Sequence, residues 1–462
     1  MSMAQTLWAP RAWLPGGWRE AVLLQVDAQG RWLSVLPDTT APDDATRLAG
    51  PVLPGLVDAH GHAFQRAFAG LAERRESADD DFWSWRDRMY RVANAVDPAM
   101  LRAIAAQLYG ELLRGGYTQV CEFHYVQHQP DGTAYADRLA MSQALVDAAS
   151  ETGIGLTLLP VLYERAGFTQ PALRPDQRRF HLDADGVWAV QQAVQAQSHA
   201  RLNAGVAIHS LRAARPESIH RLRQLAEGLD GPIHIHVAEQ PAEVHDCLAH
   251  TGLRPVEWLA QQDLLDARWQ LVHATHVNST EILAVAHAGS TAVICPSTEA
   301  NLGDGLTDLP AWLRASVPLA VGSDSHVTRA WREELRWMDY GQRLSLKCRN
   351  VAAAPERGQP ATAARLWESA LDGGGRAAGH SVWGLHPGAR ADLLVVDLAD
   401  ASLAGIPPTR LLDALVFSSP GRPWRDVMVA GDWVVRDHHQ RGTAERLARF
   451  EAVMQGLWSA EG

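Results

Sequence analysis

The residues best suited to chemistry are histidines and carboxylates at the ends of short apolar runs. His60 and His62 follow the run 52–59. In an extended chain residues i and i+2 point to the same side, so both imidazoles can reach one ion. The same placement recurs at the ends of later runs, at His236, Glu239, His273 and Asp324. Imidazoles and a carboxylate suit zinc or a similar divalent ion with water at an open position.

The elements that must position these residues alternate between apolar runs and longer helical patterns. Each run is rich in valine, isoleucine and leucine, as expected of a strand buried on both faces. The predicted strands are 52–59, 117–124, 153–162, 203–210, 232–239, 268–276, 290–297 and 318–325. The predicted helices run from Asp97-Pro98 to Gly115-Gly116 and over about 137–151, 186–200, 216–228, 241–250, 278–288 and 332–346.

Eight strands that alternate with helices predict an α/β fold, a (β/α)8 TIM-like barrel, whose active sites lie at the C-terminal strand ends. A doubly wound parallel sheet is the alternative, but no G-x-G-x-x-G motif follows the first strand. The ends of the chain differ, because 20–36 has a hairpin pattern and 389–397 and 424–436 read as short antiparallel strands. The expected organisation is a small β-sandwich domain formed by 1–51 and 379–462, with a helical tail at about 443–458, around a barrel at 52–378.

The lysine content bears on the number of metal ions. Lys347 is the only lysine, and it follows the eighth predicted strand. Many two-metal hydrolases of barrel architecture bridge their ions with a carboxylated lysine from a strand in the middle of the barrel. That bridge is not available here, so we expect one metal ion per chain.

Composition excludes several classes of protein. The formal net charge is −11, and the chain has no basic block, which argues against nucleic-acid binding. No stretch is apolar for 18 residues, and the first residues lack the pattern of a signal peptide. The four cysteines are far apart and form no C-x-x-C pair. We therefore expect a cytoplasmic enzyme with reduced thiols and no membrane partner.

Four segments, PGLVDAHGH, HVAE, LVHATH and GSDS, together resemble the amidohydrolase superfamily and its single-zinc deaminase branch. The resemblance covers almost the whole chain, including the later segment GLHPGARADLLVVD. It implies that the zinc ligands are His60, His62, His236 and Asp324. It also implies that His273 and Asp324 accept the proton of the attacking water and that Glu239 transfers protons to the substrate.

A narrower resemblance, to the formimidoylglutamate deiminase family, lies in HGHAFQRAFAGL, FWSWRDRMY, EFHYVQHQPDGTAYAD, HSLRA, HIHVAEQ and CPSTEANLGDG. It implies hydrolysis of N-formimidoyl-L-glutamate to N-formyl-L-glutamate and ammonia in histidine degradation, by a homodimer. Gly61 stands where a serine is expected and Gln127 where a histidine is common. Neither position is a ligand, so the implied metal site is unaffected.

A substrate of this kind carries two carboxylates, so its pocket needs cations opposite the metal. Arg212, just beyond the fourth predicted strand, can offer a bidentate clamp. Tyr125 can donate a hydroxyl, and His209 belongs to the same rim. Gln65 and Arg86 come from the long segment after the first strand, and Arg86 could instead serve a subunit contact.

Two alternatives share the metal residues. A deaminase of a nucleobase or a similar heterocycle would need flat stacking surfaces, which Trp83 and Trp85 could supply. A catalytically inactive relative retained as a scaffold would have lost a ligand or the proton-transfer residue, and none of these residues is missing. Comparison of substrates and analysis of bound metal distinguish the three classes.

Overall fold

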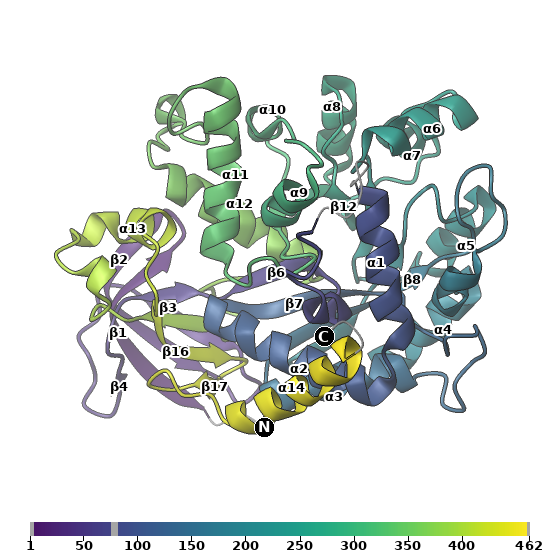
Figure 1. The fold of residues 1–462 in the computed structure, drawn as a ribbon. Coiled ribbons are helices and arrows are strands. Elements are labelled where there is room, and N and C mark those ends of the chain that lie inside the picture. The colour runs from purple at the N-terminus through teal and green to yellow at the C-terminus, as the bar shows by residue number, and fades with distance from the viewer. Residues whose placement is uncertain (1–3, 75–81, 460–462) are drawn as a thin grey trace.

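Parallel strands form the part of the fold that carries the predicted metal residues. The computed structural model describes residues 4–74 and 82–459. Eight strands follow one another around a barrel, and a short ninth, β9 (Leu202–Ala204), pairs with β8 (Figure 1). The barrel strands are β6 (Leu56–Gly61), β7 (Tyr117–His124), β8 (Gly155–Leu162), β10 (Val206–Ile208), β11 (Ile233–Val237), β12 (Trp269–His273), β13 (Thr291–Ile294) and β14 (Leu319–Val321).

The barrel closes between its first and last strands at the site itself. Gly61 and Asp324 form a parallel bridge, and the amide of Asp324 donates to the carbonyl of His60 at 2.9 Å. The closing hydrogen bonds therefore hold the first-strand histidines against the carboxylate that follows the last strand. The predicted α/β barrel with a separate β-structure is confirmed.

Helices surround the barrel and follow its strands in sequence (Figure 1). They are α1 (Phe82–Ala95), α2 (Pro98–Gly115), α3 (Ala140–Thr152), α4 (Ala184–Gln195), α5 (Pro216–Leu225), α6 (Pro241–Thr251), α7 (Pro255–Gln261), α8 (Ser279–Ala288), α9 (Pro296–Leu302), α10 (Leu309–Arg314), α11 (Trp331–Leu346) and α12 (Thr362–Ala377). A 3-10 helix, η1 (Ala63–Ala67), follows β6 directly.

The ends of α2 follow from its sequence. Asp97 is the N-cap, and its side chain accepts a hydrogen bond from the amide of Met100 at 2.8 Å. Pro98 occupies the first helical position, where no amide hydrogen is needed. The helix ends at Gly116, whose φ of 96° is a conformation that glycine adopts without steric cost.

The two ends of the chain meet in a second, mostly antiparallel sheet beside the barrel (Figure 1). Its strands are β1 (Gln5–Leu14), β2 (Gly17–Val26), β3 (Trp32–Leu36), β4 (Thr46–Arg47), β5 (Val52–Pro54), β15 (Leu393–Val396), β16 (Trp424–Val429) and β17 (Asp432–Val435). The strand β5, just before the barrel, pairs with both β1 and β15. The helices α13 (Leu411–Phe417) and α14 (Thr443–Trp458) belong to the C-terminal segment. The domain boundaries themselves remain a prediction.

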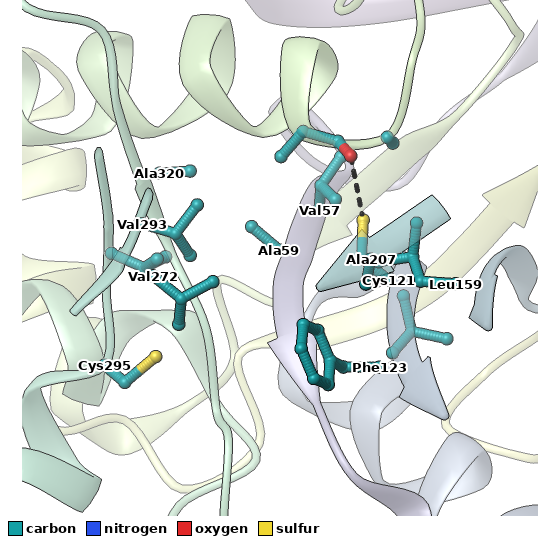
Figure 2. Close-up of a cluster of buried hydrophobic side chains, with 14 of the residues drawn as sticks. Val57, Ala59, Cys121, Phe123, Leu159, Ala207, Val272, Val293, Cys295 and Ala320 are labelled. Carbon is teal, nitrogen blue, oxygen red and sulfur yellow. Dashed lines mark hydrogen bonds between the residues drawn. The ribbon is translucent and has the colours of Figure 1, made fainter. Parts of the chain in front are cut away.

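The barrel interior is filled with small and branched side chains (Figure 2). Val57, Ala59, Val272 and Ala320 are buried inside it. Cys121 also lies there and donates through Sγ to the carbonyl of Ala377 in α12 at 3.4 Å. A packed interior leaves the strand ends as the place where polar side chains can gather.

All four cysteines are free thiols, and three of them are buried. Among the described residues no helix is both long and apolar enough to cross a membrane.

Candidate active site

Three imidazoles and one carboxylate converge at the C-terminal ends of the barrel strands. The Nε2 atoms of His60 and His236 lie 3.0 Å apart. Asp324 Oδ1 lies 3.5 Å from Nε2 of His60 and 3.4 Å from Nε2 of His62. Four donor atoms from strands β6, β11 and the segment after β14 therefore face one another.

Backbone carbonyls orient two of these rings. Nδ1 of His62 lies 2.9 Å from the carbonyl oxygen of Phe123, and Nδ1 of His236 lies 3.0 Å from that of His209. A carbonyl only accepts, so each Nδ1 carries the hydrogen and each Nε2 presents a lone pair to the cluster. Burial lowers the pKa of His60, His62 and His236, which keeps the rings neutral. This donor set fits a divalent ion such as zinc.

The backbone around the site is unusual. Ala238, His273, Ala274 and Asp324 all have positive φ, between 46° and 68°. Non-glycine residues rarely adopt this left-handed region, and where they do the surrounding structure must hold them there. For Asp324 the hydrogen bond to His60 and the neighbouring strand supply that constraint.

His273 links the cluster to two further carboxylates. Its Nε2 lies 3.7 Å from Oε1 of Glu239 and 3.8 Å from Oδ2 of Asp324. Its Nδ1 lies 3.3 Å from Oε1 of Glu299, which also accepts from the amide of Cys295 at 2.9 Å. Although burial opposes it, the charge of these carboxylates raises the pKa of His273 to about 10. Burial raises the pKa of Glu239 to about 7, against the attraction of His273.

One cavity joins this cluster to the predicted substrate residues. Its wall contains every predicted site residue except His60: His62, Gln65, Arg86, Tyr125, His209, Arg212, His236, Glu239, His273 and Asp324. His60 is fully buried next to His236. The structure therefore brings together residues from six separate segments of the barrel and from α1.

The two arginines meet at a tryptophan of α1. The guanidinium carbon of Arg86 lies 4.6 Å, and that of Arg212 5.3 Å, from the ring centre of Trp83. The two cations thus lie on one indole. Both arginines also line the cavity that holds the histidine cluster. Burial, together with the charge of Arg212, lowers the pKa of His209 on the same wall.

Sequence reasoning missed Glu299. It lies in α9, within the segment CPSTEANLGDG, and is 4% exposed. Glu299 lies just after β13, as the other carboxylates of the site lie just after their strands. This position in the sequence could have identified it as a candidate site residue. The further residues of the wall, such as Met89, Tyr90 and Leu302, come from helices whose packing a single sequence does not reveal.

Comparisons with known proteins agree with this geometry. A model of the amidohydrolase family matches residues 52–434. A formimidoylglutamate deiminase from Pseudomonas aeruginosa is 46% identical over 98% of this chain and 99% of its own length. The crystal structure of an amidohydrolase from Brucella melitensis superposes with a TM-score of 0.92 at 39% identity, covering 98% of this chain and 99% of that one.

A more distant relative acts on a different kind of compound. A 5-methylthioadenosine/S-adenosylhomocysteine deaminase from Halobacterium salinarum is 27% identical over 93% of this chain and 92% of its own length.

Proposed function

Because the chain belongs to the amidohydrolase family, we propose that it hydrolyses N-formimidoyl-L-glutamate to N-formyl-L-glutamate and ammonia, a step of histidine degradation. The observation that carries the proposal is that the wall of one cavity holds both the imidazole–carboxylate cluster and two arginines. Such a cavity suits a substrate with a formimidoyl group and two carboxylates. The name and the near-complete coverage of the Pseudomonas aeruginosa relative support the same reaction.

His60, His62, His236 and Asp324 would hold one Zn²⁺ per chain, or a similar divalent ion. Their convergent Nε2 and Oδ1 atoms and their neutral rings support this assignment. A bound zinc ion lowers the pKa of water from 15.7 to about 7, which supplies a nucleophile at neutral pH. Lys347, the only lysine, lies just past the end of α11, so a carboxylated lysine cannot bridge a second ion.

The three catalytic groups take different parts in the proton transfers. Asp324 would accept the proton that the attacking water loses. His273, whose carboxylate neighbours raise its pKa, would face that water as an imidazolium and hold it by a hydrogen bond beside Asp324. Glu239 would protonate the imino nitrogen as the water adds. Its carboxylate would then take the hydroxyl proton of the tetrahedral adduct and pass it to the amino nitrogen, so that the carbonyl forms, the C–N bond breaks and ammonia leaves. The proton held by Asp324 would return to Glu239 and restore the starting state. A pKa near 7 suits a group that must both accept and donate a proton at neutral pH.

Substrate carboxylates would bind at the two arginines of the cavity. Arg212 and Arg86 each present a planar fork that matches a carboxylate, and their position on Trp83 holds the forks together. Gln65, Tyr125 and His209 line the same cavity. They would orient the chain of the substrate between its two ends.

We also propose that the protein forms a homodimer and is located in the cytoplasm. The unpaired state of all four cysteines supports a reducing compartment. Size-exclusion chromatography with light scattering measures the mass of the protein in solution. We expect the mass of two chains, and the mass of one chain would contradict the homodimer.

The experiment that tests the function compares ammonia release from N-formimidoyl-L-glutamate, guanine and cytosine by the purified enzyme. The rival activity, deamination of a heterocycle, needs an open aromatic face, and two guanidinium groups already lie close to Trp83. We expect turnover of formimidoylglutamate alone. Faster release of ammonia from either base would refute the proposed substrate and favour the rival.

A further inference from the structure

A second cavity, with a volume of about 520 Å³, lies on another part of the molecule. It is bordered by the end of α2, the segment that leads from β14 into α11, and the turn before β16. The elements α2, α11 and β16 are labelled in Figure 1. None of its lining residues belongs to the candidate active site. We call it the junction cavity. Its charged wall consists of Arg114, Arg329, Arg332, Arg422, Glu111 and Glu333, with His438 beside them.

The positive charge of this wall is only partly balanced. Arg329 Nε lies 3.2 Å from Glu111, but that carboxylate also accepts from Arg66 at 2.7 Å. Across residues 4–74 and 82–459, no carboxylate lies within 4.0 Å of a guanidinium nitrogen of Arg114, Arg332 or Arg422. The wall therefore carries an excess of cations.

Arg332 is the strongest indication of an anion site among these residues, because its guanidinium is buried. Its side chain is 6% exposed, and its Nη1 has only the carbonyls of Pro420 and Leu415, at 3.3 and 3.5 Å. Its Nε is buried and has no hydrogen-bond partner among the described residues. Burial lowers the pKa of Arg332 to about 10. Buried charges in proteins are nearly always paired.

The wall of the junction cavity thus carries more guanidinium groups than carboxylates that could pair with them. Both carboxylate oxygens of Glu111 are already engaged by Arg66, Gln107 and Arg329. Trp424, Val427 and Val435 add an apolar part to the wall, which suits the organic body of a ligand.

We propose that the junction cavity binds a small organic oxyanion through Arg332 and Arg422. A phosphate ester and a dicarboxylate share the required chemistry, namely several acceptor oxygens and a charge that compensates the buried guanidinium. The site is separate from the proposed reaction and does not depend on it.

Calorimetric titration of the metal-loaded enzyme with inorganic phosphate and with glutarate tests this site, at fixed ionic strength in chloride buffer. The variants are Arg332→Gln and Arg422→Gln, and the second keeps the test valid if the first does not fold. Arg221→Gln is the matched control, because Arg221 is an exposed arginine of α5 that pairs with Asp185. Glutarate can also enter the active site, so only the change caused by the cavity substitutions is counted.

We expect saturable binding of at least one anion, weakened about tenfold or more by Arg422→Gln and by Arg332→Gln and unchanged by Arg221→Gln. The anion whose affinity falls in the cavity variants identifies the class of the ligand. A fall for phosphate indicates a phosphate ester, and a fall for glutarate indicates a dicarboxylate. Equal affinities in all variants, or no saturable binding of either anion, would overturn the proposal.

Discussion

Glu239 is the residue on which the proposed proton transfers depend most. It lies 3.7 Å from His273 and is not one of the four converging ligand residues. Glutamine has the same size but cannot shuttle protons. Glu239→Gln should therefore keep its metal while kcat falls by about 10² or more. Metal analysis and steady-state kinetics on the same preparation check this, and near-normal turnover would place the acid elsewhere.

Glu299 acts on the reaction only through His273. Its carboxylate fixes the Nδ1 side of that ring, so its loss should let the imidazole rotate away from Asp324. We expect Glu299→Ala to lower kcat about 10- to 100-fold with little change in KM and with full metal content. Glu299→Gln, which retains an acceptor oxygen, should recover part of the rate. A wild-type kcat in both variants would show that Glu299 has no positioning role. Glu445→Gln is the control, because Glu445 is exposed.

Arg212 tests the substrate end of the cavity. Lysine keeps the charge but lacks the planar fork, so Arg212→Lys should lower kcat/KM for N-formimidoyl-L-glutamate by about tenfold or more. Metal content should stay at the wild-type level, because Arg212 is not one of the proposed ligands. Loss of metal, or an unchanged preference over an analogue that lacks one carboxylate, would make Arg212 structural and weaken the substrate assignment.

At the scale of elements, the barrel strands could be predicted because burial on both faces gives each a continuous apolar run, as in Gly155–Leu162. Because the barrel strands are parallel, the polar residues at their C-terminal ends all lie at the same rim. No helix is predicted from the sequence over α1, although this helix carries Arg86 to the cavity. The carbonyl of Phe123, which orients His62, leaves no trace in a sequence because every residue has a carbonyl.

Arg390 joins the antiparallel sheet to the barrel. It makes two hydrogen bonds to Asp392, at 2.9 and 2.6 Å, and also donates to Gln119 and to the carbonyl of Thr118 in β7. Both charges are buried, so removal of one leaves the other uncompensated. Arg390→Met should lower the free energy of unfolding by about 3–5 kcal/mol. Arg390→Lys, which keeps the charge, should lower the free energy of unfolding by less. If denaturant unfolding shows the wild-type free energy for Arg390→Met, Arg390 does not have this role.

At the scale of the whole molecule, the barrel and its cavity are built around the proposed metal position. The architecture could be predicted from the alternation of apolar runs with helical patterns, and the convergence of the proposed ligand residues from their place at the strand ends. The side chains that fill the cavity wall and the junction cavity depend on contacts between distant segments, such as Arg332 with Pro420. Such contacts are set by three-dimensional packing and not by local pattern.

The central claim is that one metal ion, held by His60, His62, His236 and Asp324, supports hydrolysis of N-formimidoyl-L-glutamate. Titration of metal-free enzyme with zinc, with ammonia release from this substrate as the readout, tests it most directly. Activity should be negligible without metal, rise linearly and reach its plateau at one equivalent of zinc per chain. A plateau at two equivalents, or turnover by the metal-free enzyme, would contradict the account.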